Sequence, residues 1–194
     1  MTLHALSQAI FLIAAMSVAG VVHVLWLRSK WSHQFTLAID GGVTFRGRRL
    51  FGDNKRLCGF MVLPPMAAMI FLLLGAVRES LPPFFSENLW TLTAGQYSVL
   101  GFVAGLAFML AELPNSFVKR RLGIAPGEVS QNFWLRPLFL VIDRVDSVLG
   151  VLLAVSLMVP VPIGTWIWTL VLGAAAHAGF SIAMHSLSIK ARPL

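Results

Sequence analysis

Residues 137–158 read PLFLVIDRVDSVLGVLLAVSLM, and this stretch decides the fold. A helix needs about 20 mostly apolar residues to cross the hydrocarbon core of a bilayer. The stretch is long enough, and three charged residues, Asp143, Arg144 and Asp146, interrupt it. Charges inside a membrane are costly, and they are functional candidates by default. The stretch therefore predicts a membrane helix that carries part of a functional site.

Four further apolar stretches occupy residues 5–27, 57–77, 97–113 and 164–187. Together with the first they predict an all-α integral membrane protein with five transmembrane helices. The composition agrees, since 57% of the residues are hydrophobic and only 12% are charged. Residues 5–27 lack a positive leading segment and are too long for a cleaved signal peptide, so we expect a retained helix. Without a linker or clear repeat, residues 1–194 are treated as one domain.

The basic residues indicate the orientation of these helices. They gather in the connections 28–56 and 114–136, whereas the other two connections hold only Arg78. Lys and Arg are retained on the cytoplasmic side of a membrane. Both basic loops and a tail with Lys190 and Arg192 should therefore face the cytoplasm, with the N-terminus outside, in an inner or plasma membrane. Trp90 is expected at the outer interface.

Two classes of function are disfavoured by composition. Cys58 is the only cysteine, so the chain can form neither an intrachain disulfide nor a thiolate metal cage. The net charge is +7, but the basic residues lie between apolar runs rather than in an aromatic-interleaved stripe. We therefore expect no nucleic-acid partner, and the positive charge suits membrane orientation or phosphate binding better.

Asp143 and Asp146 are the most informative residues. Positions i and i+3 share a helix face, so both carboxylates can point at one spot, with Arg144 about a quarter-turn away. Two hard oxygen donors suit Mg²⁺ that is shared with substrate phosphates. The alternative is that these charges neutralise one another or pair with Arg136. Membrane lipids surround the site in either case.

A second polar cluster occupies residues 112–121, where Pro114 is expected to interrupt the hydrogen bonding of its helix at the cytoplasmic surface. Such a concentration of cations suits a triphosphate, because Lys supplies a point charge and Arg a bidentate fork. The alternative is a plain positive anchor at the membrane surface. The candidate residues are Glu112, Asn115, Ser116, Lys119 and Arg120.

A third cluster is a glycine-bearing loop at residues 39–56, which leads into the second helix. Glycines let backbone amides approach an anion closely, although the loop is not a Walker motif. A surface turn with anchoring arginines is the alternative. The candidates here are Gly52, Asn54 and Lys55. His177 and His185 are eight positions apart and out of register, so they are expected to be packed or interfacial, with His177 a possible contact.

Two of these clusters resemble a known family. Ser116 to Arg120 matches the S-x-x-K-R element of CDP-diglyceride synthases, and Asp143 to Asp146 matches their D-R-x-D element. The smaller CDP-archaeol synthase group is more similar still. It shares the Asp-Gly-Gly loop at Asp40, the Gly-Asp-Asn-Lys run at 52–55, the run ELPNSFVKRRLG at 112–123 and the stretch 177–193. The resemblance covers the chain from about residue 40 onward.

The resemblance implies a CTP-dependent cytidylyltransferase, in which a lipid phosphate attacks the α-phosphate of CTP, pyrophosphate leaves and a CDP-lipid forms, with Mg²⁺ required. It also implies a membrane core of about five helices. By position, Asp143, Asp146 and Lys119 would be catalytic. The carboxylates of Asp143 and Asp146, with Glu112, would bind the metal. The implied contacts to CTP and its phosphates are Gly52, Asn54, Lys55, Asn115, Ser116, Lys119, Arg120 and Arg144.

The chain departs from the family at residues 56–58, where Arg-Leu-Cys replaces the usual Thr-Trp-Arg. The acceptor therefore stays open between an ether-linked isoprenoid lipid, phosphatidate and another lipid phosphate. A CDP-alcohol phosphotransferase is disfavoured because its D-G-x-x-A-R pattern is absent. An ion-coupled transporter or a lipid-binding membrane protein would leave the 54–55 and 116–120 matches unexplained. The sequence leaves the oligomeric state open, a homodimer included.

Overall fold

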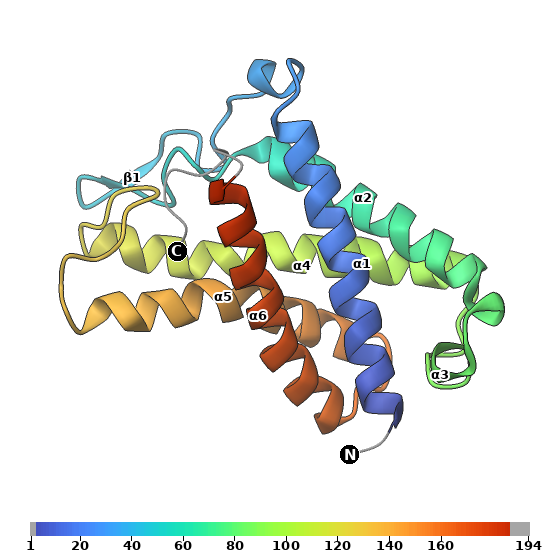
Figure 1. Ribbon diagram of the computed structural model, residues 1–194. Helices are drawn as coiled ribbons and strands as arrows, with labels where there is room; N and C mark the ends of the chain where they lie inside the picture. The colour runs from blue at the N-terminus through green and yellow to red at the C-terminus, as the bar shows by residue number, and fades with distance from the viewer. Residues whose placement is uncertain (1–2, 187–194) are drawn as a thin grey trace.

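The computed structural model describes residues 3–186, and the chain in this range is almost entirely helical (Figure 1). The side chains of His33 and of residues 180–186, which include His185, lie outside the description, as do Lys190 and Arg192 of the predicted tail. Five helices have 20 residues or more within residues 3–186, which confirms the all-α class. They are α1 (Leu3–Leu27), α2 (Leu57–Ala76), α4 (Ala94–Arg121), α5 (Leu135–Ser156) and α6 (Ile163–Ser186).

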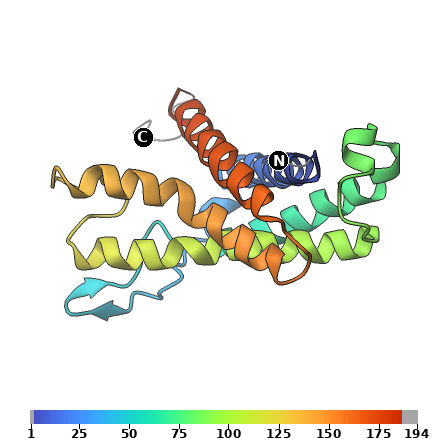
Figure 2. The same cartoon turned by 90° about the horizontal axis from the view of Figure 1, so that it is seen from below.

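The long helices pack in two groups. α4 lies between α2 and α5 and contacts both, and α4 and α5 run side by side in opposite directions (Figures 1 and 2). α1 and α6 pack on each other and cross this layer, with α1 also touching α2 and α6 touching α5. The contact between α2 and α4 is close because Gly101 and Gly105 face Ala67 and Pro64 without side chains between them.

Three of the helices, α1, α2 and α4, are long and apolar enough to cross a membrane. α6 adds a shorter apolar stretch, Ile163–Gly179. α5 has 22 residues, enough to span the hydrocarbon core, but its charges Asp143, Arg144 and Asp146 lie in its middle. The membrane character expected from the sequence is thus confirmed for three helices, and the crossing by all five stays a prediction.

α4 differs from its predicted end. The apolar pattern and Pro114 placed that end near residue 113, but the helix continues through Pro114 to Arg121. A proline removes one backbone hydrogen bond, and packing against neighbouring helices can compensate for that loss. α2 likewise contains Pro64 and Pro65 in its interior. The extension carries the polar residues Asn115, Ser116, Lys119 and Arg120 on a helix rather than on a loop.

The connection between α2 and α4 contains a 3-10 turn, η2 (Arg78–Ser80), and a short helix, α3 (Pro83–Ser86). Trp90 was expected at the outer membrane interface, and its depth in a bilayer stays a prediction. Its side chain is buried in the core with Phe11 and Tyr97, and its indole N–H donates to the carbonyl of Pro160 at 2.8 Å. Aromatic packing and a satisfied N–H thus keep Trp90 inside the bundle.

The loop between α1 and α2 holds a 3-10 turn, η1 (Ser32–Gln34), and a small hairpin. Strand β1 (Thr44–Phe45) pairs antiparallel with β2 (Arg48–Arg49). The two residues of the turn, Arg46 and Gly47, both have positive φ, as a tight hairpin turn of this kind requires. The hairpin lies beside the C-terminal end of α4 (Figure 2).

Candidate active site

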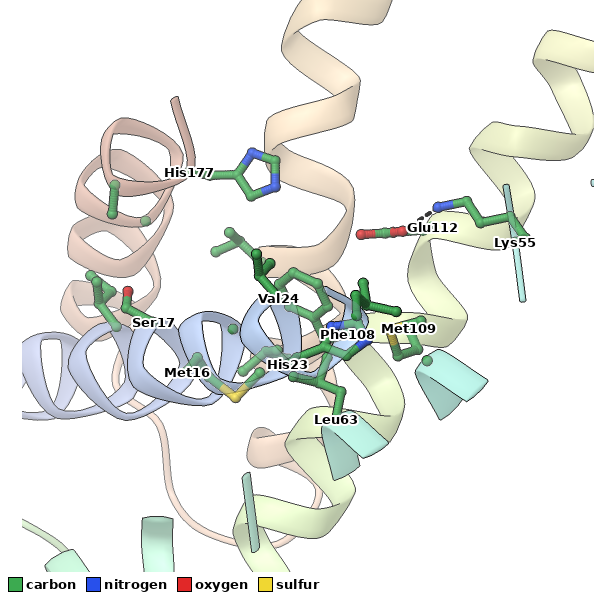
Figure 3. Close-up of a pocket in the computed structure, with 18 of the residues that line it drawn as sticks. Met16, Ser17, His23, Val24, Lys55, Leu63, Phe108, Met109, Glu112 and His177 are labelled. Carbon is green, nitrogen blue, oxygen red and sulfur yellow. Dashed lines mark hydrogen bonds and ion pairs between the residues drawn. The ribbon is translucent and has the colours of Figure 1, made fainter. Parts of the chain in front are cut away.

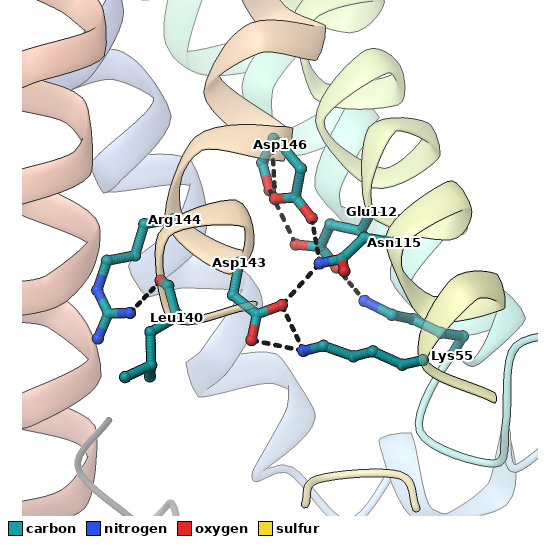
Figure 4. A network of polar contacts seen from close by, with 9 residues as sticks. Lys55, Glu112, Asn115, Leu140, Asp143, Arg144 and Asp146 are labelled. Carbon is teal, nitrogen blue, oxygen red and sulfur yellow. Dashed lines mark hydrogen bonds and ion pairs between the residues drawn. The ribbon is translucent and has the colours of Figure 1, made fainter. Parts of the chain in front are cut away.

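The centre of the site is an amide that joins two carboxylates. Asp143 and Asp146 of α5 face α4, as their spacing on one helix face leads one to expect. The Asn115 side-chain amide on α4 donates from Nδ2 to Asp143 Oδ1 at 2.6 Å and to Asp146 Oδ2 at 2.9 Å (Figure 4). Its Oδ1 atom is buried and has no hydrogen-bond partner among the described residues. The two carboxylates therefore share one hydrogen-bond donor, and the amide oxygen beside them is an acceptor that no described residue uses.

Two lysines, one from α4 and one from the loop before α2, reach the same network. Lys119 Nζ lies 2.5 Å from both carboxylate oxygens of Asp143 and over the ring of Phe139. Lys55, from the loop before α2, forms an ion pair with Glu112 of α4. Asp143 is thus neutralised by a lysine from α4. The sequence analysis considered only neutralisation within α5 or pairing with Arg136, and it did not foresee this partner.

Ser147 connects the two halves of this network. Its hydroxyl lies 3.2 Å from Glu112 Oε1 and 3.1 Å from Asp146 Oδ1, so it can donate to either carboxylate. Ser147 is fully buried. The sequence analysis gave this residue no role, although its place next to Asp146 and four residues after Asp143 was the available signal.

Arg144 has a different orientation from its neighbours. Its guanidinium donates to the carbonyl of Leu140 on its own helix and points away from Asp143 and Asp146 (Figure 4). It still lines the polar pocket described below. The structure therefore brings Arg144 to the edge of the pocket but not into the carboxylate network.

Arg120 is buried behind the network, next to the glycine-bearing loop. Only 7% of the residue is exposed, and its Nε and Nη1 atoms have no hydrogen-bond partner among the described residues. A Cβ atom at Gly52 would lie 2.9 Å from Arg120 Nη1, so the guanidinium is accommodated by the absence of a side chain there. Buried guanidinium nitrogens without a partner are costly, and a phosphate oxygen would satisfy these two.

Asp40 fixes the backbone of this loop. Its side chain is completely covered, forms an ion pair with Arg49 and accepts hydrogen bonds from the amides of Gly42, Phe51 and Gly52 at 3.1 to 3.3 Å. Burial alone would raise the pKa of Asp40, but these hydrogen bonds outweigh it and hold the pKa well below its usual range. The carboxylate therefore stays charged and sets the conformation that precedes Asn54 and Lys55.

Two arginines join the hairpin to the end of α4. Arg48 donates to the carbonyls of Arg120 and Arg121, which caps the last turn of the helix. Arg121 donates in return to the carbonyls of Phe45, Arg48 and Arg49. The sequence analysis considered these arginines only as membrane anchors or phosphate ligands. We call this pair, Arg48 and Arg121, the arginine clasp.

The site opens into two adjoining cavities. A polar pocket of about 340 Å³ is lined by Ser116 and by the network residues other than Ser147, together with Gly127 and Glu128 from the loop after α4. A larger, mostly apolar cavity of about 580 Å³ lies among α1, α2, α4, α5 and α6 (Figure 3). The residues that line both are Asn54, Lys55, Glu112 and His177.

The donor set restricts how a metal could bind. Among the side chains that the structure describes, no group of three or more His, Cys, Asp or Glu residues is arranged to hold a metal ion. Mg²⁺ does not need such a cage, because it usually retains several waters and binds one or two carboxylates together with substrate phosphates. Asp143 and Asp146, beside the open Oδ1 of Asn115, fit this second mode.

Comparisons with known proteins agree with the resemblance. A family model described as CarS-like CDP-archaeol synthase matches residues 34–194. A CDP-archaeol synthase from Pyrobaculum arsenaticum is 32% identical over 177 residues, which cover 91% of each chain. One from Saccharolobus islandicus is 31% identical over 158 residues, 80% of each chain.

A third relative, the CDP-archaeol synthase of Methanococcoides burtonii, is 34% identical over 126 residues, which cover 63% of this chain and 67% of the relative. No solved structure matches this chain. The family match extends over most of the sequence and includes every candidate residue of both cavities except those of α1 and of the segment just after it. The chain therefore belongs to the CarS-like CDP-archaeol synthase family and is a CTP-utilising transferase.

Proposed function

We propose that the chain transfers the cytidylyl group of CTP to a membrane lipid phosphate, releasing pyrophosphate and forming a CDP-lipid. One observation carries this proposal: a polar pocket with paired carboxylates and cations adjoins an apolar cavity, and Lys55 and Glu112 line both. The names of the relatives favour archaeol phosphate, an ether-linked isoprenoid lipid, as the acceptor. The polar pocket would take the nucleotide and the apolar cavity the lipid.

The charges of the polar pocket suit a polyphosphate. Asp143, Asp146 and Glu112 are offset by Lys119 and Lys55, and Arg120 remains without a hydrogen-bond partner for two of its nitrogen atoms. CTP would therefore bring its negative charge to a pocket whose cations are already placed. We assign Lys119 and Arg120 to the triphosphate, with Gly52 leaving room for the guanidinium.

The remaining contacts follow from the lining of the pocket. Asn54 and Lys55 would complete the nucleotide site from the loop before α2, and Ser116 and Arg144 would reach it from its edges. Asp143 and Asp146 would hold Mg²⁺, with Glu112 and Asn115 beside them. When bound, the metal would neutralise charge on the phosphates as the reaction proceeds. Asn115 and Ser147 orient the carboxylates for this task.

The chemistry requires positioning more than a covalent nucleophile. An oxygen of the lipid phosphate attacks the α-phosphorus of CTP, and the bond from that phosphorus to the bridging oxygen of the β-phosphate breaks. Pyrophosphate carries the bonding electrons away. A phosphate monoester is already a competent nucleophile, so the protein supplies charge and alignment rather than a strong base. Lys55, which lines both cavities, lies where the two phosphates would meet.

We further propose that all five long helices cross the membrane, with the N-terminus outside and the site facing the cytoplasm. α5 can be accommodated because its carboxylates turn toward Asn115 and Lys119 of α4 rather than toward lipid. Both basic loops lie at the end of α4 that carries the site, as the hairpin contacts of Arg121 require. This arrangement agrees with the distribution of Lys and Arg.

The test is conversion of labelled CTP by purified protein in detergent with Mg²⁺ and a panel of lipid phosphates, read by chromatography of the lipid phase. Wild type should yield a nucleotide-labelled lipid. Asp143→Asn and Asp146→Asn should each abolish it, whereas Glu79→Gln, at an exposed position after α2, should not. Near-wild-type turnover in both aspartate variants would reject the metal assignment. No labelled lipid from any acceptor, despite a folded protein, would reject the proposed reaction.

A further inference from the structure

We infer that His23 of α1 recognises the lipid acceptor by donating a hydrogen bond to its linkage oxygens. These are the ether or ester oxygens between the glycerol and the hydrocarbon chains. The inference rests on the proposed function and adds a specificity residue that none of the sequence motifs includes. It is carried by three observations: the place of His23 in the apolar cavity, its buried and unsatisfied Nε2 atom, and the order of polar and apolar residues along the cavity wall.

His23 lies about one helical turn before the C-terminal end of α1, the end that reaches the polar part of the cavity. It precedes the last residue of α1, Leu27, by four positions, or about 6 Å along the helix axis. Its ring rests over Gly59 of α2, where a Cβ atom would lie 3.7 Å from Nε2. Figure 3 shows the ring among Leu63, Phe108 and Met109, with the Glu112 and Lys55 pair on one side of it.

The Nε2 atom of His23 is buried and has no hydrogen-bond partner among the described residues. A polar atom buried in apolar surroundings without a partner is unfavourable, and proteins rarely retain one without a reason. His23 itself lines the cavity, so a rotation of its imidazole ring would bring Nε2 to a ligand that fills the cavity. Of the two imidazole tautomers, the one protonated at Nε2 would donate to an oxygen that only accepts.

The order of side chains along the wall of the apolar cavity indicates which ligand oxygen would accept this hydrogen bond. Asn54, Lys55 and Glu112 lie at the polar end, where the phosphate would bind. Leu12 and Met16 lie on α1 two to three turns farther from its C-terminal end than His23. An amphiphile with its phosphate at Lys55 and its chains toward Met16 places its glycerol linkage beside His23. Ether and ester oxygens are neutral acceptors and match a neutral N–H donor.

The experiment compares two acceptors of equal chain length. One is a glycerol-linked lipid phosphate, and the other is a simple alkyl phosphate that has no linkage oxygens. For His23→Leu we expect the KM for the glycerol-linked lipid to rise roughly tenfold, the effect of one lost hydrogen bond. The KM for CTP, the kcat and the KM for the alkyl phosphate should change less than about twofold. His23→Gln, which keeps an N–H donor, should recover part of the loss.

His4→Leu is the matched control, because His4 lies on the same helix but at its exposed far end. Thermal stabilisation of the purified protein by the two lipids gives a readout that does not need turnover. If His23→Leu raised the KM for both acceptors equally, or for neither, the role of His23 would be overturned while the proposed reaction would stand. If wild type makes no CDP-lipid, the proposed reaction is rejected instead. The role of His23 is then decided by thermal stabilisation: the glycerol-linked lipid should stabilise wild type more than His23→Leu, and the alkyl phosphate should stabilise both equally.

Discussion

Asn115 places a single amide between two carboxylates that would otherwise repel each other. Hydrogen bonds to charged groups contribute about 1.5 to 3 kcal/mol each. Asn115→Leu removes the shared donor, so we expect a loss of stability on the order of 2 kcal/mol. Because Mg²⁺ would compensate the same two charges, the loss should shrink as Mg²⁺ is added. Thermal unfolding in detergent over a Mg²⁺ series measures both effects.

Val118→Ala is the control for this change, since Val118 lies on the same helix but is exposed. Its effect should be small and independent of Mg²⁺. A stability loss in Asn115→Leu that stays the same at every Mg²⁺ concentration would show that Asn115 only packs between the helices. It would also argue against the metal assignment of Asp143 and Asp146.

Gly52 offers a second test at the scale of one residue. Its φ is +99°, and a Cβ atom there would lie 2.8 Å from Pro126 and 2.9 Å from Arg120 Nη1. Gly52→Ala should therefore displace Arg120 and weaken CTP binding by about tenfold, which corresponds to about 1.4 kcal/mol. The measurement is the KM for CTP at saturating lipid phosphate.

Gly42→Ala separates backbone strain from displacement of the arginine. Gly42 has a similar φ of +89°, but a Cβ atom there meets nothing within 4 Å. It should cost about 1 kcal/mol of stability, as expected for an unfavourable backbone conformation, and leave the KM for CTP unchanged. Equal effects of the two substitutions on CTP would mean that loop strain, rather than Arg120, controls nucleotide binding.

At the scale of single elements, Asp40 predicts that the protection of the loop before α2 depends on pH. We call this buried carboxylate, with its bonds to Arg49 and to the amides of Gly42, Phe51 and Gly52, the Asp40 lock. The pKa of Asp40 is lowered in the fold, so its contribution is present above the unfolded pKa of about 4 and is lost as pH falls toward the folded pKa. Amide exchange at Phe51 and Gly52, corrected for its intrinsic pH dependence, should therefore remain slow at neutral pH and accelerate only below about pH 4. Asp40→Asn should exchange fast even at neutral pH.

Asp53→Asn is the matched control for the lock. Asp53 pairs with the same Arg49, but its side chain is 77% exposed, and exposed ion pairs contribute little. Its exchange profile should follow wild type. Fast exchange in Asp53→Asn would mean that Arg49, rather than the buried carboxylate of Asp40, holds the loop.

The elements also show what a sequence can predict. The stretch 57–77 became α2 (Leu57–Ala76) nearly residue for residue, because apolar length is a local property. The shared face of Asp143 and Asp146 also followed from local spacing. Asn115 and Lys119 meet those carboxylates only because α4 and α5 pack in one rotation, which no local pattern encodes. The arginine clasp joins residues 73 positions apart, and it was missed for the same reason.

Pro114 illustrates the opposite error, in which a sound local rule is overridden by packing. A proline usually ends a helix, yet α4 continues through Pro114, because packing against α2 and α5 compensates for the lost backbone hydrogen bond. Trp90 shows what a local rule leaves out. The preference of tryptophan for the membrane interface says nothing about its partners in the fold, which are the carbonyl of Pro160 and the rings of Phe11 and Tyr97.

At the scale of the whole molecule, the arrangement of charge and cavity would let one chain process both a nucleotide and a lipid, as proposed above. The carboxylates of α5 turn toward α4, so the helix can lie in a membrane while its polar face borders the polar pocket. The apolar cavity lies deeper among the helices and shares Lys55 with that pocket. A lipid phosphate could then reach the nucleotide without leaving the bilayer.

This arrangement requires a single orientation, which labelling can test. Val43, directly before β1, and Glu87, directly after α3, are both exposed. β1 and α3 lie at opposite ends of the bundle (Figure 1). Cys58 is buried, and Cys58→Ala gives a background without thiols. In that background, Glu87→Cys should react with a membrane-impermeant maleimide in intact cells, whereas Val43→Cys should react only after permeabilisation. The reverse pattern would place the site on the outer side, where no CTP is supplied, and would reject the proposed orientation together with the reaction.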